Sequence, residues 1–288
     1  MIFACLRWMQ QRLEPNTHSC GVIQPNLTAS NMIDRYPPLR KLALLLGFSP
    51  FVFLKAITGI PYFVGTVRKY QRLNRHGSFR IFFRHLFPVL ADRGDTAGVA
   101  GGHYFHQDLW AARKILRRGP AKHIDIGSRV DGFISHVLVF MPVTIIDIRP
   151  LSSNIQGLTF IRDDATKLAQ IPDDSVESLS SLHAAEHFGL GRYSDPIDPS
   201  ACFEFMNALQ RVLAPGGNLY FSVPVGRERV EFNAHRIFSP QTIAQTFSQL
   251  RLLSFSYIGD DGCLYEEAQM TAAGQCDYGC GLFHFTKG

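Results

Sequence analysis

Acidic side chains stand at the ends of three predicted strands in this chain. Asp125 comes two residues before Gly127 at the end of the first strand, Asp147 ends the second, and Asp164 with Ala165 follows the third. Parallel strands bring their carboxyl ends to one edge of a sheet, so these groups are predicted to line one crevice. Carboxylates there can accept hydrogen bonds from ribose hydroxyls or from the amine of a base. The spacing therefore indicates a nucleotide-type pocket.

A cluster of imidazoles and one carboxylate follows the fourth predicted strand. His183, Glu186 and His187 could act there as acid or base groups, and Glu186 or His187 could take a proton from a hydroxyl. A structural role, in which these side chains bond the backbone of the next loop, stays open. The order His-x-x-Glu-His also matches an inverted zinc-protease motif, which needs a continuous helix. We disfavour a protease because this segment leaves a strand and enters Gly189-Leu190-Gly191.

The elements that must position these groups alternate between short apolar strands and helices. This order predicts an α/β fold, a doubly wound and mostly parallel sheet with helices on both faces. The last two strands are expected to form an antiparallel pair at one edge. Asp131 is expected to cap the helix after the first strand, and Asp198-Pro199 and Ser239-Pro240 to open two later helices. The expected strands are 122–126, 143–146, 158–161, 176–182, 219–223, 252–257 and 282–286. The expected helices are 105–116, 131–140 and 239–250, together with one that begins at 198 and has its apolar face at 202–213.

The same residues resemble a known superfamily. Asp125-x-Gly127, Asp147, Asp164-Ala165 and the Pro215-Gly216-Gly217 turn before the fifth strand look like the class I S-adenosylmethionine-dependent methyltransferases. The resemblance implies a Rossmann-like, seven-stranded sheet and S-adenosyl-L-methionine as cofactor. It also implies that Gly127 approaches the methionine part, that Asp147 holds the ribose and that Asp164 meets the adenine.

The glycine-rich loop departs from that superfamily. Arg129 and Asp131 occupy positions where glycine is usual, and Arg129 could instead pair with a carboxylate of the ligand. A narrower resemblance, to the bacterial domain of unknown function 268 family, includes this altered loop and implies a role in surface-polysaccharide or glycan biosynthesis. Its motifs here are Gly102–Asp108, His123–Arg129, Glu186–Tyr193, Asp195–Pro199 and Phe232–Arg236.

These resemblances lead to a set of expected site residues and no expected metal. A divalent ion held by Asp195, Asp198 and a histidine stays open as an alternative, and Cys276-x3-Cys280 is a poor zinc half-site because no second pair stands at ligand spacing. The expected catalytic residues are His187, Glu186 and His183; the cofactor-binding residues Asp125, Gly127, Ser128, Arg129, Asp147, Asp164 and Ala165; and the substrate-binding residues His103, His106, Arg192, Tyr193, Asp195, Asn233, His235 and Arg236.

Charge divides the chain into parts. The stretch from Arg35 to Arg84 contains ten Lys and Arg residues and no Asp or Glu, which favours an acidic partner. Residues 42–67 are mostly apolar but are broken by Gly47, Pro50, Gly59 and Pro61. They predict a pair of short helices, and peripheral contact with anionic lipid is the alternative. We expect a loosely ordered extension over 1–34, a basic helical segment over 35–96 and the methyltransferase-like domain over 97–288.

The function that the sequence predicts is methyl transfer to a hydroxyl of a sugar or a lipid-linked glycan precursor, in surface-polysaccharide biosynthesis. Scattered cysteines and the lack of a secretory pattern favour the cytoplasm, with peripheral contact at the inner membrane as an option. The alternative is a non-catalytic binding or scaffold protein with the same fold. A nicotinamide enzyme is weaker because there is no Gly-x-Gly-x-x-Gly run, and no stacking pattern supports nucleic-acid binding.

Overall fold

The chain divides into two compact units, 1–99 and 100–288. A computed structural model describes residues 50–95, 97–98 and 100–288. The extension expected over 1–34 and the start of the basic segment, 35–49, lie outside the described residues. Each unit is taken by itself below.

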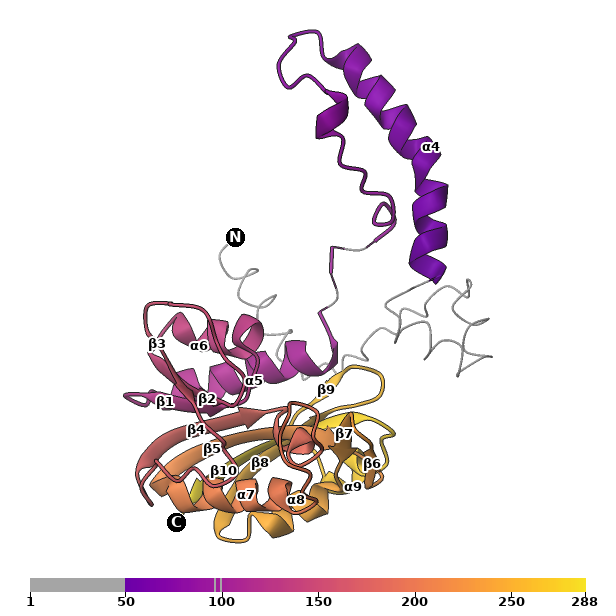
Figure 1. Ribbon diagram of the computed structural model, residues 1–288. Coiled ribbons are helices and arrows are strands. Elements are labelled where there is room, and N and C mark those ends of the chain that lie inside the picture. Colours follow the sequence, from indigo (N-terminus) through magenta and orange to yellow (C-terminus); the bar gives the residue numbers. More distant parts are fainter. Residues whose placement is uncertain (1–49, 96, 99) are drawn as a thin grey trace, which may run out of the picture. The chain divides into compact units, whose positions relative to one another are not determined.

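The second unit is built on an eight-stranded sheet with the order β3-β2-β1-β4-β5-β10-β8-β9 (Figure 1). Strands β3 to β5 pair in parallel, whereas β10 is antiparallel to both β5 and β8. The predicted doubly wound sheet with an antiparallel edge is thus confirmed, and the short β9 adds an eighth strand. The strands are β1 His123–Ile126, β2 Val143–Asp147, β3 Leu158–Arg162, β4 Val176–Leu182, β5 Leu213–Val225, β8 Leu250–Ile258, β9 Leu264–Tyr265 and β10 Gly279–Lys287, and a separate hairpin pairs β6 Arg229–Glu231 with β7 His235–Ile237.

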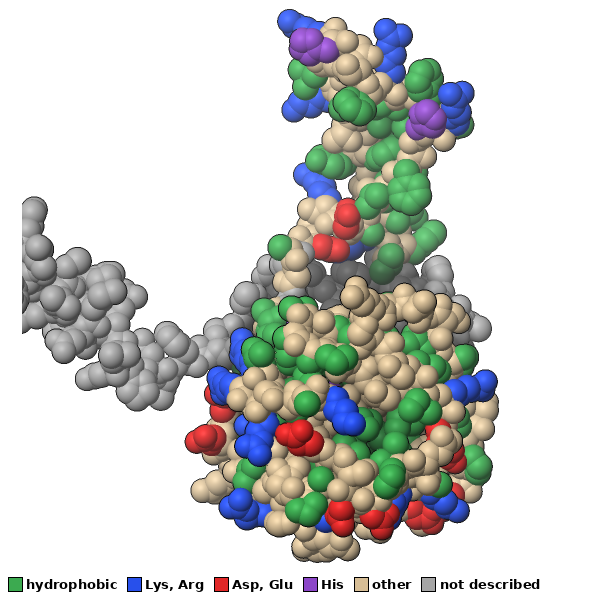
Figure 2. All heavy atoms as spheres, turned by 90° about the vertical axis from the view of Figure 1, so that its left-hand side faces the viewer, with side chains coloured by type: hydrophobic (Ala, Val, Ile, Leu, Met, Phe, Trp, Pro, Cys, Tyr) green, Lys and Arg blue, Asp and Glu red, His purple; other side chains and the backbone are tan. Residues whose placement is uncertain are grey.

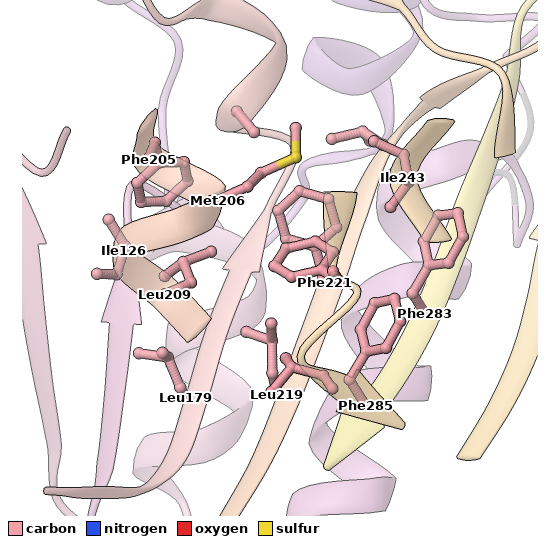
Figure 3. Close-up of a cluster of buried hydrophobic side chains, with 14 of the residues drawn as sticks. Ile126, Leu179, Phe205, Met206, Leu209, Leu219, Phe221, Ile243, Phe283 and Phe285 are labelled. Atoms are coloured by element: carbon pink, nitrogen blue, oxygen red, sulfur yellow. The ribbon is translucent and has the colours of Figure 1, made fainter. Parts of the chain in front are cut away.

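Helices cover both faces of this sheet (Figure 1). On one face, α5 buries Trp110 and Ile115 in a cluster with Phe133 and Val137. On the other, α7 presents the predicted apolar stripe, and its side chains pack on strand residues such as Leu179 and Phe221 (Figure 3). The helices are α5 Gly102–Arg118, α6 Ser135–Leu138, α7 Ala201–Val212, α8 Pro240–Thr246 and α9 Met270–Ala273, with a π-helical turn η2 at Val130–Ile134 and a 3-10 turn η3 at Ala185–His187.

Three helix predictions in this unit were wrong in detail. Helix α7 begins at Ala201 after the cap residue Ser200, so Asp198-Pro199 precedes the helix and does not open it. The helix expected over 131–140 is the π-helical turn η2 followed by the short α6, and its cap residue is Arg129. Asp131 does not cap it, because its carboxylate pairs with the Arg129 guanidinium instead. Helix α8 ends at Thr246, four residues before its predicted end at Leu250, where β8 begins.

The described part of the first unit contains one long helix, α4 Pro50–Leu73, and a 3-10 turn, η1 Phe83–His85. A pair of short helices was expected over 42–67 and is wrong for the described residues, because α4 continues through Pro61. The segment after α4 returns along it, since a Cβ on Gly59 would collide with the carbonyl oxygen of Leu90. Arg93 also lies over the Tyr62 ring at 3.9 Å. Among the described helices, none combines the length and the apolar character needed to cross a bilayer.

Candidate functional site

A cavity of about 720 Å³ opens at the carboxyl ends of the parallel strands. Drug-sized ligands bind in concave sites of about 300–1,000 Å³, so its size suits a nucleotide-type ligand. Both walls come from the second unit. The segments that line it are the β1 turn with Arg129, the ends of β2 and β3, the segment 183–198 after β4, the start of α7, and the side chains of Tyr104, His235 and Tyr278.

The turn after β1 is held from below by a buried carboxylate. Asp125 accepts hydrogen bonds from the backbone N–H and the hydroxyl of Ser128, and from the hydroxyl of Ser180 on β4. Burial raises the pKa of Asp125 to about 6 despite these hydrogen bonds. Gly127 has φ +73°, and a Cβ there would lie 2.9 Å from that of Ala184. Glycine is therefore required for the close approach of this turn to the β4 end.

Two arginines lie beside the cofactor-type carboxylates. Asp147, at the end of β2, has a side chain only 13% exposed and is held by the guanidinium and backbone N–H of Arg149. Arg129 pairs with Asp131 and lies 4.8 Å from the centre of the Tyr104 ring. Both guanidiniums are about half exposed. Either can therefore reorient toward an anionic group in the cavity.

The third carboxylate organises its own turn. Asp164 accepts hydrogen bonds at Oδ1 from the backbone N–H and the hydroxyl of Thr166. Ala165, Ile126 and Ile146 line the same cavity. An apolar wall next to a carboxylate suits a flat base that carries an exocyclic amine.

His183 sits at the tip of β4 in a left-handed conformation, φ +53°, which is rare for a residue with a side chain. Its backbone N–H donates to Ser222 on β5, and its Nδ1 lies 2.7 Å from Oε1 of Glu186. Both side chains are almost fully buried. Burial raises the pKa of Glu186, but His183 and His187 outweigh this and lower it below its usual value. Glu186 is therefore an ionised carboxylate held between two imidazoles.

His187 is oriented with one ring nitrogen toward the cavity side of this cluster. Its Nδ1 donates to the carbonyl of Ala234 at 2.7 Å, which leaves the lone pair on Nε2. Nε2 lies 3.7 Å from Oε1 of Glu186. Burial and the nearby Arg192 lower the pKa of His187, against the opposing effect of Glu186. A neutral imidazole with a free Nε2 can accept a proton.

The segment after η3 is built around Asp195. Its carboxylate accepts hydrogen bonds from the backbone N–H groups of Gly189, Gly191 and Tyr193. Asp198 likewise accepts from the backbone N–H and hydroxyl of Ser200 at the start of α7. Both carboxylates thus organise backbone, and the alternative in which they hold a divalent ion gains no support from these contacts.

The cavity brings together most of the predicted site residues. Six lie elsewhere. Asp125 and Ser128 are buried beneath the lining. His103 lies behind it, with Nε2 3.1 Å from the carbonyl oxygen of Tyr278, and His106 contacts the backbone of Gly262. Asn233 is exposed in the β6–β7 turn, and Arg236 donates to the carbonyls of Phe188 and Pro199. The predicted residues that line the cavity are Gly127, Arg129, Asp147, Asp164, Ala165, His183, Glu186, His187, Arg192, Tyr193, Asp195 and His235.

Sequence reasoning missed several lining residues, among them Tyr104, Arg149 and Tyr278. Arg149 could have been found from its place two residues after Asp147, where its guanidinium can reach back to a strand-end carboxylate. Tyr278 carries no local signal. It lies just before β10, and its ring stacks 5.1 Å from that of His103.

One family model matches part of the chain. Residues 155–269 match the family described as "Caenorhabditis protein of unknown function, DUF268". The DUF268 match covers β4, η3, α7 and β5, and so includes the His183–His187 cluster. No curated protein matches the chain.

Solved structures with a similar fold include methyltransferases and the [4+2]-cyclase SpnF. The 1,6-didemethyltoxoflavin-N1-methyltransferase of Burkholderia thailandensis, with bound 1,6-didemethyltoxoflavin and S-adenosylhomocysteine, is 14% identical; the match covers 63% of this chain and 78% of that one, with a TM-score of 0.47. The N-methyltransferase NodS of Bradyrhizobium japonicum WM9, in complex with S-adenosylhomocysteine, is 13% identical over 65% and 88% of the two chains, with a TM-score of 0.46. The matched residues lie in the second unit, whose strand order and parallel β3 to β5 make it a Rossmann-like α/β domain.

Proposed function

We propose that this protein is an S-adenosylmethionine-dependent methyltransferase that acts on a hydroxyl of a sugar or glycan precursor. The observation that carries the proposal is one cavity lined by Gly127, Asp147 and Asp164 together with Glu186 and His187. Cofactor-type groups and a proton acceptor thus face the same space.

The residues present fit the cofactor. Gly127 allows the turn after β1 to approach the tip of β4, because a Cβ there would meet that of Ala184. Arg129 pairs with Asp131 at a half-exposed site and could exchange that partner for a carboxylate on the methionine end. Asp147 is placed to accept ribose hydroxyls, and Asp164 with Ala165 to hold the adenine. When bound, the cofactor supplies a methyl group on a positively charged sulfur that leaves as a neutral thioether.

The chain's own contribution is orientation and proton transfer. A sugar hydroxyl is a weak nucleophile until its proton is shared, and Nε2 of His187 would accept that proton. The imidazolium so formed would later return the proton to solvent. Glu186 lies close enough to stabilise the imidazolium. Holding both reactants in line supplies the rest of the acceleration.

A sugar acceptor is supported by a polar wall of the cavity that adjoins the Asp147–Arg149 pair, since the Arg149 guanidinium lies 5.0 Å from the centre of the Tyr193 ring. Arg192, Tyr193 and His235 line that wall, and the Arg192 guanidinium lies 5.2 Å from the centre of the Tyr193 ring. Hydroxyl-rich ligands need such donors and acceptors beside an aromatic face. We propose surface-polysaccharide biosynthesis as the setting of this activity.

A non-catalytic glycan-binding protein is the second candidate. The contact that favours it is the pairing of Arg149 with both carboxylate oxygens of Asp147, which are the atoms that would accept ribose hydroxyls. If Arg149 keeps that position, the cofactor is excluded and only the polar wall binds a ligand.

Titration calorimetry with S-adenosylhomocysteine distinguishes these candidates. The wild-type chain should bind the compound, and Asp147→Asn should weaken binding by at least tenfold. Asp173→Asn is the matched control, because Asp173 also pairs with an arginine, Arg211, but precedes β4 at the opposite edge of the sheet. Wild-type protein that binds glycan precursors but no S-adenosylhomocysteine would support the second candidate.

A further inference from the structure

Three side chains from distant parts of the sequence meet beside the cavity. His103 comes from the first turn of α5, His183 from the tip of β4 and Cys280 from the start of β10. One potential ligand atom from each lies within 4.8 Å of the others. Cys280 is fully buried, and the His183 side chain is only 5% exposed. A buried set of two imidazoles and one thiol needs a reason to be together.

The key atom in this cluster is Nε2 of His183. It is buried and has no hydrogen-bond partner among the described residues, while Nδ1 of the same ring is held by Glu186. A metal-binding imidazole has this pattern, in which one nitrogen faces the metal and the other bonds a carboxylate. His103 is fixed in a related way, through Nε2 and the carbonyl of Tyr278.

We propose that His103, His183 and Cys280 bind a zinc-class transition metal whose remaining coordination position faces the cavity. Imidazole nitrogen and thiolate sulfur are the ligands that zinc prefers, and three protein ligands leave its fourth position open. Tetrahedral zinc needs ligand atoms about 3.3–3.8 Å apart, so binding would draw the side chains together by up to about 1 Å. The role of this metal rests on the proposed function. The metal would bind the acceptor hydroxyl and lower the pKa of that hydroxyl, and His187 would take its proton.

The test measures metal binding directly and needs no substrate. Full-length protein, freed of metal by a chelator under reducing conditions, is titrated with Co²⁺ while thiolate-to-cobalt charge-transfer absorption is recorded. One equivalent of Co²⁺ should produce this band, and one equivalent of Zn²⁺ should remove it. Absence of the band in folded wild-type protein would overturn the proposal, whether or not S-adenosylhomocysteine binds.

Matched variants identify the ligands. Cys280→Ser should abolish the band and His103→Gln should weaken cobalt binding by at least tenfold. Cys276→Ser and His106→Gln should leave both unchanged, because neither residue belongs to the cluster. Circular dichroism checks that each variant is folded. A band that survives in Cys280→Ser, or is lost in Cys276→Ser, would contradict this ligand set.

A separate observation concerns the first unit. Hydrophobic side chains and basic residues are exposed together along its described part (Figure 2). Phe79, Phe83 and Phe87 are 84–92% exposed. No Asp or Glu occurs between residues 50 and 91, while Lys and Arg occupy positions 55, 68, 69, 72, 75, 80 and 84.

We infer that this unit binds the surface of an anionic membrane. Apolar and aromatic side chains enter the headgroup boundary, while a surface on which basic residues outnumber Asp92 and Asp95 is attracted to anionic lipid. Among the described helices, none is long and apolar enough to cross a bilayer. Contact would therefore be peripheral.

Co-sedimentation of the full chain with vesicles tests this inference. The protein should pellet with vesicles that contain phosphatidylserine and should remain in the supernatant with pure phosphatidylcholine. The double change Phe83→Ser and Phe87→Ser should reduce binding at least tenfold. Val139→Ser is the control, because Val139 is equally exposed in the second unit. Equal binding to both vesicle types, or undiminished vesicle binding by the double variant, would overturn the inference that this unit binds anionic membranes.

Discussion

A Cβ on Gly127 would lie 2.9 Å from the Cβ of Ala184, so the turn after β1 touches the tip of β4. Gly127→Ala should therefore displace the cofactor turn from the cluster after β4. We expect at least a tenfold loss of affinity for S-adenosylhomocysteine, measured by calorimetry.

Gly216→Ala is the control for that change. Gly216 has the same φ of +73°, but a Cβ there meets open space. Gly216→Ala should lower the free energy of unfolding by about 1 kcal/mol through backbone strain alone, and it should leave the affinity for S-adenosylhomocysteine unchanged. Equal affinity losses in the two variants would show that the contact with Ala184 is irrelevant.

The buried carboxylate of Asp125 predicts a pH effect on stability. Its pKa is 3.8 in model compounds and about 6 in the folded chain, so the folded state binds the proton more tightly. This contribution to stability is present at low pH and is lost as the pH rises from about 4 to about 6. Asp125→Asn imitates the protonated side chain, so wild type should gain stability relative to this variant on acidification. Each pKa unit is worth about 1.4 kcal/mol.

Urea unfolding of both proteins at pH 7 and pH 4.5 measures this difference. Ser180 and Ser128 should still bond the amide, so the variant is expected to fold. A difference in free energy of unfolding that is the same at the two pH values would contradict the account of Asp125.

Loss of the proton acceptor should slow methyl transfer without affecting cofactor binding. His187→Asn keeps a donor for the carbonyl of Ala234 but removes Nε2. We expect a fall in kcat of about 10²–10⁴, the usual contribution of general-base catalysis. Transfer of labelled methyl groups into glycan precursors measures it.

His136→Asn controls for the loss of an imidazole, because Nδ1 of His136 bonds the carbonyl of Gly132 in the same way at an exposed site. It should retain wild-type activity. Unimpaired transfer by His187→Asn would leave His187 with a structural role only.

Asp195 is predicted to hold the segment after η3 in place. An asparagine side chain accepts hydrogen bonds only at Oδ1, whereas both carboxylate oxygens of Asp195 accept them. Asp195→Asn therefore loses at least one of the hydrogen bonds from Gly189, Gly191 and Tyr193. Hydrogen bonds to charged groups are worth about 1.5–3 kcal/mol, so amide hydrogen exchange in this loop should accelerate about tenfold or more.

Asp260→Asn provides the comparison, because Asp260 accepts from the backbone N–H groups of Asp277 and Tyr278. Its effect should be confined to that loop. Unchanged exchange at Gly189 and Gly191 in Asp195→Asn would refute the role given to Asp195.

The sequence predicted those features that depend on local pattern. Strand β4 was placed at its observed bounds, although four of its seven residues are Glu or Ser. Asp147 and Asp164 were expected in one crevice because parallel strands finish at one edge, and both line the cavity. The antiparallel β10 and β8 were also expected.

Features that depend on tertiary contacts were missed. Pro61 predicted a break, yet α4 continues through it alongside a returning segment. Cys280 lies 97 residues after His183, and they meet only because β10 runs antiparallel and so begins at the edge where β4 ends. No local pattern encodes that meeting.

The most direct test of the central claim is a crystal structure of the full chain grown with S-adenosylhomocysteine. The account predicts the ligand in the cavity, with its ribose hydroxyls bonded to the Asp147 carboxylate and Arg149 displaced from that position. A ligand bound outside the cavity, or a cavity in which Arg149 still holds Asp147 at saturating ligand, would contradict it.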